Sequence, residues 1–174
     1  STASGAISQA AAQDATSYGY GSHALGQSST AIGSTASAKQ KDTTAVGYDA
    51  TADNEKDTAV GAYATAQNDD STAIGNRANA VKVNGTAVGS QADIYGDNGT
   101  AVGKSAYVGV FSANGTTLGN GAYIGNTSNN DTVLGQSAAL TSDSIDNTTV
   151  VGQGASSGGS YSVALGQGAN AAQF

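Results

Sequence analysis

Acidic side chains are the residues in this sequence whose types and spacing could do chemistry. They cluster at Asp53 to Asp57, at Asp69-Asp70 and at Asp143 to Asp146. Two carboxylates within reach of each other could act as a general acid and base, or could bind calcium. The glycine-rich, Asp-bearing nonapeptide spacing of calcium-binding β-rolls is absent, however. We therefore interpret these clusters as solvated turns that keep the protein soluble.

Other residue types offer little support for catalysis or for a cofactor. His23 is the single histidine and there is no cysteine, so a His- or Cys-based metal site is not expected. Matches to Asn-x-Ser/Thr, such as those beginning at Asn84, Asn98 and Asn114, recur in one phase and read better as turn residues than as glycosylation acceptors. We predict that the protein is not an enzyme and has no catalytic residues, metal or cofactor.

Charge and hydropathy exclude two classes of partner. The formal net charge is −7, and the six basic residues are scattered along the chain. Nucleic-acid binding requires clustered Lys and Arg, so we expect none. No apolar run approaches the roughly 20 residues that span a bilayer, so we expect no direct membrane insertion by this chain.

A repeat of about 14 residues organises the whole sequence. Thr-Ala-Val/Ile-Gly or a close variant recurs, and three residues after most of these glycines stands an Ala-x-Ala segment. The spacing is 14 residues as far as Gly103, then 16, 16, 17 and 14. We expect tight corners with positive φ at the repeated glycines, which after the first two are Gly33, Gly47, Gly61, Gly75, Gly89, Gly103, Gly119, Gly135, Gly152 and Gly166.

A unit of this length suits one coil of a β-solenoid with two short strands and two turns. In Ala-x-Ala the middle residue is mostly polar. Because side chains alternate along a strand, we expect the middle residue to point to solvent and the two alanines to point to the interior. In Thr-Ala-Val both faces look apolar, as in strands covered on both sides. We predict that Val and Ile fill the coil interior and that the alanines form an interface between copies, although the pattern leaves the reverse open. The predicted interface residues are Ala45, Ala59, Ala73, Ala87 and Ala101.

Stretches such as STAIGSTASA, TAVGYDATA and YSVALGQGANA resemble the head repeats of trimeric autotransporter adhesins, the YadA-like family. The resemblance covers essentially the whole chain. It implies an all-β, left-handed parallel β-roll of about twelve coils, three copies of which join side by side in a homotrimer. It also implies the extracellular part of an outer-membrane-anchored virulence protein on the bacterial cell surface, attaching to host cells or to a matrix protein such as collagen.

We expect a single head domain over residues 1–174. Regular coils span 1–103, longer coils 104–152, and a regular coil 153–174; the family's neck, stalk and membrane anchor are not recognised in the sequence. The longer coils depart from the plain repeat, so their local register is open.

Binding residues are expected where the repeat deviates. The second alanine of Ala-x-Ala becomes larger at Ile94, Val108, Ile124 and Leu140. The outward column also changes from polar residues to tyrosine, which gives Asp93, Tyr107, Tyr123 and Ala139 as candidate ligand contacts. Stacked outward tyrosines would offer an aromatic binding patch, but tyrosine also suits strands for purely structural reasons. Phe111, in a lengthened turn, is expected either to cap the interior or to be an exposed contact, and we favour the cap.

Three other functions compete with a trimeric adhesin. A non-enzymatic trimeric phage-type fibre would share the same physics. An ice binder would use a rank of threonines, and the sequence has one such rank at Thr30, Thr44, Thr58, Thr72, Thr86, Thr100, Thr116, Thr132 and Thr149. An ice-binding face would require two parallel ranks of threonine. Here the position that would hold the second rank, two residues after the Thr, is mostly Val or Ile. A solenoid glycosidase would need adjacent outward carboxylates, and Asp93 is flanked by Asn79 and Tyr107 in its column.

Overall fold

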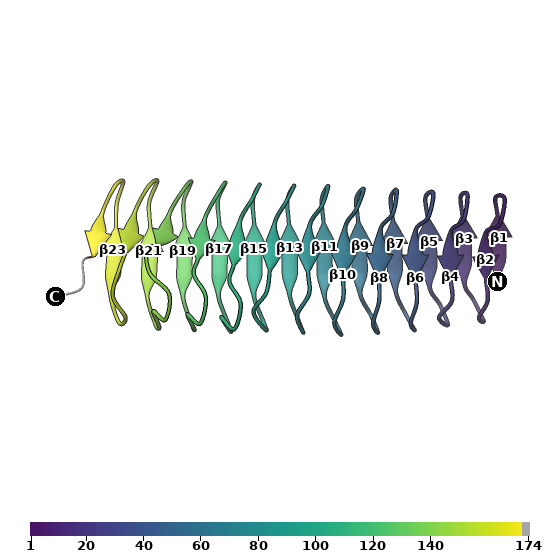
Figure 1. Ribbon diagram of the computed structural model, residues 1–174, viewed down its shortest axis with the longest axis horizontal. Helices are drawn as coiled ribbons and strands as arrows, with labels where there is room; N and C mark the ends of the chain where they lie inside the picture. The colour runs from purple at the N-terminus through teal and green to yellow at the C-terminus, as the bar shows by residue number, and fades with distance from the viewer. Residues whose placement is uncertain (172–174) are drawn as a thin grey trace. The chain divides into compact units, whose positions relative to one another are not determined.

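The computed structural model describes residues 1–171, and within this range the chain is built from short β-strands and turns, without a helix. It divides into two compact units, an N-terminal unit (Ser1–Asn84) and a C-terminal unit (Gly85–Phe174). Each coil contributes one three-residue and one two-residue strand, so each unit is a parallel β-solenoid of six coils (Figure 1). The predicted all-β solenoid is confirmed, and the single head domain stays a prediction.

The N-terminal unit holds the first twelve strands. Its three-residue strands are β1 (Thr2–Ser4), β3 (Thr16–Tyr18), β5 (Thr30–Ile32), β7 (Thr44–Val46), β9 (Thr58–Val60) and β11 (Thr72–Ile74). Its two-residue strands are β2 (Gln9–Ala10), β4 (His23–Ala24), β6 (Ser37–Ala38), β8 (Thr51–Ala52), β10 (Thr65–Ala66) and β12 (Asn79–Ala80).

The C-terminal unit holds the other twelve. Its three-residue strands are β13 (Thr86–Val88), β15 (Thr100–Val102), β17 (Thr116–Leu118), β19 (Thr132–Leu134), β21 (Thr149–Val151) and β23 (Val163–Leu165). Its two-residue strands are β14 (Asp93–Ile94), β16 (Tyr107–Val108), β18 (Tyr123–Ile124), β20 (Ala139–Leu140), β22 (Ser156–Ser157) and β24 (Asn170–Ala171).

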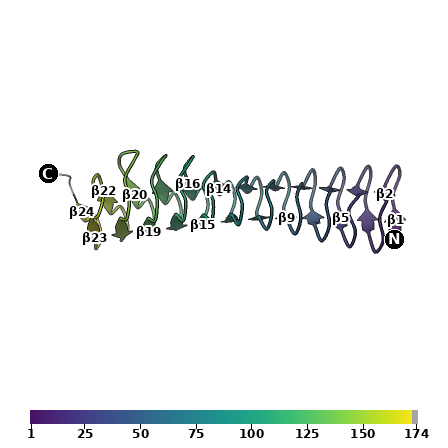
Figure 2. The same ribbon diagram turned by 90° about the horizontal axis from the view of Figure 1, so that it is seen from below.

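Strand register is kept through the longer coils. Like positions of successive coils pair in parallel, for example Thr44 with Thr58 in the regular part. Thr100 pairs with Thr116, and Thr132 with Thr149, although 16 and 17 residues separate them. The extra residues therefore lie in the turns that follow β16, β18 and β20, where the loops of the C-terminal unit are longest (Figure 2).

The interior of the coils is lined by alanine, which corrects one prediction. The central alanine of Thr-Ala-Val is 0% exposed within a single chain, so it cannot form an interface between copies. This holds for all five predicted interface residues, Ala45, Ala59, Ala73, Ala87 and Ala101. Val and Ile point outwards beside Thr; Ile32, for instance, is 39% exposed. The reverse assignment is the right one: in these regular coils the small alanine side chains of both strands fill the narrow interior.

Larger side chains enter the interior from Ile94 in β14 onwards and continue through the longer coils. Val108, Ile124 and Leu140 replace alanine in the two-residue strands and are almost fully buried. Val133 and Val150 replace the central alanine of the three-residue strands opposite them and are also buried. Ile145, from the long turn after β20, joins this cluster. The longer coils are thus wider, and their apolar core is thicker than that of the regular coils.

Glycine corners stack on one another from coil to coil. All ten predicted corner glycines have positive φ, between 115° and 145°, which confirms that prediction. A Cβ added at Gly47 would lie 2.5 Å from the carbonyl oxygen of Gly61, in the next coil. Close backbone approach therefore requires glycine here in addition to the dihedral angle.

Candidate functional site

Two of the predicted contact residues form a stacked aromatic pair on the outside of the C-terminal unit. Tyr107 in β16 and Tyr123 in β18 are register partners in adjacent strands. Their ring centroids lie 5.1 Å apart and their planes differ by 8°, so the cross-strand stacking expected from the sequence is confirmed. Tyr95, one residue after β14, adds a third ring whose centroid is 5.8 Å from that of Tyr107. We call these three rings the tyrosine ladder.

The other two candidate contacts lie in the same outward column. Asp93 is the register partner of Tyr107, and Ala139 is the register partner of Tyr123. The structure therefore brings all four predicted residues together on one face, in the order of their coils. Whether they contact a ligand stays a prediction.

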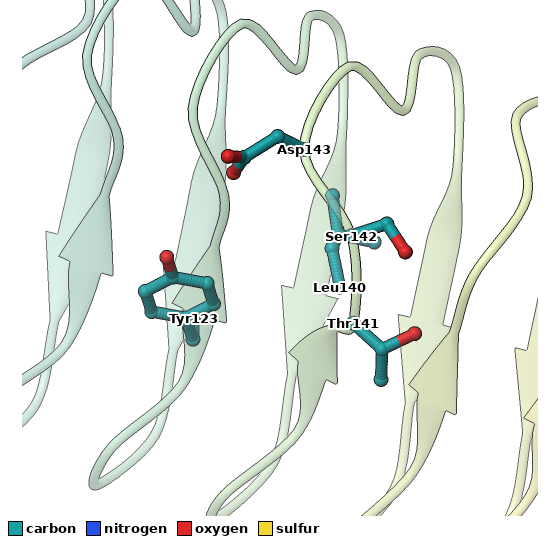
Figure 3. Close-up of a pocket in the computed structure, with 5 residues that line it drawn as sticks. All are labelled: Tyr123, Leu140, Thr141, Ser142 and Asp143. Atoms are coloured by element: carbon teal, nitrogen blue, oxygen red, sulfur yellow. The ribbon is translucent and has the colours of Figure 1, made fainter.

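A surface pocket of about 280 Å³ opens where the ladder ends (Figure 3). Tyr123 forms one side; the other side comes from the end of β20 and the turn after it, with Leu140, Thr141, Ser142 and Asp143. Leu140 is 2% exposed, so only its edge reaches the pocket. The sequence pointed to the long turn after β20 but not to this pocket, because the path of a turn does not follow from the repeat.

Hydrogen bonds to neighbouring coils hold the polar wall of the pocket. The backbone N–H of Asn126 donates to Asp143 Oδ1 at 2.7 Å, and Thr141 Oγ1 donates to the carbonyl of Ser157 at 3.1 Å. Gly125 makes this approach possible, since a Cβ there would lie 2.8 Å from Asp143 Oδ1. In Figure 3 the Asp143 side chain extends from its own coil towards that of Tyr123.

The electrostatic environment of the ladder is negative. Partial burial raises the pKa of the Tyr107 phenol, and the neighbouring Tyr123 and Tyr95 and the Asp93 and Asp143 carboxylates raise it further. Tyr107 is therefore an uncharged ring at physiological pH, next to carboxylates that attract cations.

Two acidic residues are buried; one of them, Asp57, belongs to the cluster from Asp53 to Asp57 that was predicted to be a solvated turn, which corrects that prediction. Asp57 and Asp131 are 0% exposed and occupy the buried corner position just before a three-residue strand. Asp57 accepts hydrogen bonds from the Asn54 and Ser71 backbone N–H groups and from Ser71 Oγ. Burial raises the pKa of Asp57, and it raises that of Asp131 to about 6 although the Thr148 N–H donates to this carboxyl.

Phe111 also lies elsewhere than expected. Its side chain is 71% exposed, so it does not cap the interior and the prediction is wrong. Phe111 is the positive-φ residue of its turn, with φ of 59°, and this conformation directs it away from the coil. Val108 and Ile124 fill the adjacent interior instead.

A second aromatic group in the N-terminal unit was not found from the sequence. Tyr48 and Tyr63 follow successive glycine corners and pack edge to face with their ring centroids 5.2 Å apart. In the coil after Tyr63, the guanidinium carbon of Arg77 lies 5.4 Å from the centroid of the Tyr63 ring, a cation–π contact. The signal in the sequence was a large side chain two residues after glycine in successive coils, Tyr63 and then Arg77; Tyr48 comes one residue after its glycine.

The outward face of the three-residue strands carries one rank of threonine and one of apolar residues. From β5 to β21, Thr begins each strand and Val, Ile or Leu ends it, with the buried residue between them, so the single threonine rank is as expected. We call the apolar rank the apolar column: Ile32, Val46, Val60 and Ile74 in the N-terminal unit, and Val88, Val102, Leu118, Leu134, Val151 and Leu165 in the C-terminal unit.

Residues 1–171 contain neither a metal-ligand cluster nor a membrane-spanning helix. His, Asp and Glu side chains do not gather there in any group of three or more that could hold a metal ion. The same stretch has no helix with the length and apolar character needed to cross a membrane.

Comparison with family models identifies the repeat. The model described as the YadA head domain repeat, which spans two copies, matches residues 24–50, 38–64, 52–78, 66–92 and 146–169. Together these segments cover more than half of the chain. The chain belongs to the YadA head repeat family.

The matches to the YadA head repeat stop short of the tyrosine ladder and its pocket. Residues 93–145, which hold all of the ladder and all of the pocket, lie outside the matched segments. A search of curated proteins found no match. The site is thus built on the coils that depart from the repeat typical of YadA heads.

Proposed function

We propose that this chain is the adhesive head of a trimeric autotransporter, displayed on the surface of a bacterium. The observation that carries the proposal is membership of the YadA head repeat family. The head attaches the cell to host matrix proteins such as collagen, to host cells or to other surfaces, and contributes to virulence by doing so. The proposal assigns no catalytic step to the chain, which acts by binding.

Assembly of three copies is part of the proposal, with the coils wound left-handed as in the YadA-like heads that the sequence resembles. The support comes from the apolar column, whose members stand on the outside of a single chain; Leu118 and Leu165 are 49% and 66% exposed. Regular rows of exposed apolar side chains usually mark an interface. In the trimer this column, in place of the alanines, faces the neighbouring copies.

Adhesion by such a head is multivalent. Three identical copies present each surface feature three times, so weak contacts to a repetitive matrix fibre add up to high avidity without new interactions. The acidic, solvated outer surface keeps the head soluble while leaving local patches, such as the tyrosine ladder, to contact the ligand.

The test is a solid-phase binding assay with the purified chain on immobilised collagen, other matrix proteins and albumin. We expect saturable binding to at least one matrix protein and none to albumin, with the affinity lowered when the chain is measured under conditions that keep it monomeric. Absence of binding to every matrix protein and to host cells would contradict the proposed adhesive function.

A further inference from the structure

We propose that the pocket at the end of the tyrosine ladder binds the guanidinium group of an arginine side chain on a partner polypeptide. The inference deepens the proposed adhesive function and rests on it for the source of the ligand, an exposed protein surface. It concerns the pocket formed by Tyr123, Leu140, Thr141, Ser142 and Asp143.

The shape of the pocket suits a flat group. One face of the Tyr123 ring is covered by Tyr107, which lies parallel to it within 8°. On the other side the register partner is Ala139, whose methyl group cannot cover a ring. The aromatic stack therefore ends at Tyr123. A planar group that enters the pocket can extend the stack by packing its face against the Tyr123 ring.

The chemistry of the wall suits a cation that only donates hydrogen bonds. Asp143 is an exposed carboxylate whose Oδ1 accepts from the Asn126 N–H, and its Oδ2 is a second acceptor. Thr141 Oγ1 donates to Ser157, so its lone pairs remain available to accept. None of the five lining residues is cationic, and residues 85–174 contain five aspartates and one lysine. A guanidinium is planar, permanently charged and rich in donors, and it stacks on aromatic rings while pairing with carboxylates.

The N-terminal unit contains an intramolecular counterpart of this arrangement. There the aromatic pair Tyr48–Tyr63 ends in Arg77, whose guanidinium covers the Tyr63 ring at 5.4 Å. In both units a guanidinium would cover the free face of the last tyrosine, at the level of the next coil. In the N-terminal unit the chain supplies it, whereas at Tyr123 the chain supplies Ala139 and the pocket stays open to a partner.

A titration with blocked amino acids tests the inference directly. N-acetyl-arginine amide is added to the isotope-labelled protein, and the amide signals of Thr141, Ser142 and Asp143 are followed by NMR. We expect these signals to shift, and the δ-methylene protons of the ligand to move upfield because of the Tyr123 ring current. Blocked citrulline, which has nearly the same shape but no charge, should bind about tenfold more weakly or less.

Two variants separate the two parts of the site. Asp143→Asn keeps an oxygen that accepts from Asn126 but removes the charge, and it should weaken arginine binding about tenfold. Tyr123→Leu keeps an apolar residue and should remove the upfield shift of the ligand protons. Asp97→Asn and Tyr161→Leu are the matched controls, since both residues are exposed elsewhere in the unit, and they should leave binding unchanged. Circular dichroism confirms that each variant is folded.

Three outcomes would overturn the inference: equal binding of arginine and citrulline, binding that neither site variant weakens, or binding of a methyl pyranoside in place of arginine. The last would identify a saccharide site. The titration contains no matrix protein, so its failure leaves the adhesive function standing. Conversely, failure of the chain to bind any matrix protein or host cell leaves the titration result intact.

Discussion

Single residues at the corner before each three-residue strand differ in what they do with their hydrogen bonds. Most coils place a small or hydroxyl residue there; Thr43 Oγ1, for example, donates to the carbonyl of Gln40 at 2.7 Å. Asp57 and Asp131 replace the hydroxyl by a carboxyl, which instead accepts from backbone N–H groups. One oxygen of Asp131, Oδ2, is buried without a hydrogen-bond partner. A buried carboxylate with an unpaired oxygen is costly, so its protonated form is favoured.

Replacement of Asp131 by Asn should reduce the dependence of stability on pH. The folded chain keeps the Asp131 proton up to about pH 6, whereas the unfolded chain loses it near 3.8. Between these values the folded state binds more protons, so its stability falls as the pH rises, by roughly 3 kcal/mol at most. Asp131→Asn has no proton to lose and keeps an acceptor for the Thr148 N–H. Thermal unfolding at pH 4 and pH 7 should therefore show a smaller fall in Tm for this variant.

Asp97→Asn is the control for this measurement, because Asp97 is exposed in a turn of the same unit. It should follow the parent protein at both pH values. Identical pH profiles for the parent and for Asp131→Asn would show that Asp131 is not the group responsible. The raised pKa of Asp57 acts in the same direction, so part of the fall should persist in the Asp131 variant.

At the scale of the element, the coil is defined by its glycine corner and by the pairing of two short strands. A strand of two or three residues has little stability of its own. Each one is held because both neighbours repeat its register, and because corner backbones approach each other as closely as Gly47 and Gly61 do. The corner is thus a packing contact between coils as well as a turn.

Gly47→Ala should be strongly destabilising. The added Cβ would lie 2.5 Å from the Gly61 oxygen, and φ at this position is 137°, a region that residues with side chains avoid. We expect a loss of more than about 3 kcal/mol in the free energy of unfolding, measured by denaturant titration. Gly21→Ala is the matched control in the same unit: its φ is 61° and a Cβ would meet only side-chain atoms at 3.8 Å or more. Its cost should be about 1 kcal/mol, and equal costs for both variants would contradict close stacking.

At the scale of the whole molecule, one chain leaves its apolar column uncovered. From β5 onwards, alternation within each three-residue strand places the central residue inside and the two end residues outside, the last of which is Val, Ile or Leu. The column therefore begins at Ile32 and recurs in every later coil of both units. A trimer in which the columns meet would remove these side chains from water at about 25 cal/mol per Å² of apolar area buried.

Leu118→Asp should dissociate the proposed trimer. The substitution places one carboxylate per copy in the interface, and buried unpaired charges of like sign are strongly unfavourable. Light scattering during gel filtration should give about three times the chain mass of 16.8 kDa for the parent and the chain mass for the variant. Ser156→Asp introduces the same charge on the outward face of the two-residue strands and should leave the trimer intact. A monomeric parent protein would contradict the proposed assembly.

The repeat alone was sufficient to predict the coils, the corner glycines and the outward column that contains Tyr107 and Tyr123. These features follow from spacing, because a 14-residue period with two alternating segments fits few other structures. It did not determine which face of Thr-Ala-Val points inwards. Alternation separates two faces, but with Ala on one and Val on the other both faces are apolar, and the choice depends on how wide the coil interior is.

The tertiary structure decided the features that depend on the path of turns and on neighbouring coils. Asp131 became buried because its corner position is covered by the next coil. Phe111 became exposed because it adopts a positive φ. The pocket beside Tyr123 exists because a long turn carries Asp143 towards the ring while Ala139 leaves the ring uncovered. The contacts of Asp131 and of the pocket are not local in sequence, since they join residues 16 to 20 positions apart, and the repeat specifies only the residues that every coil has in common.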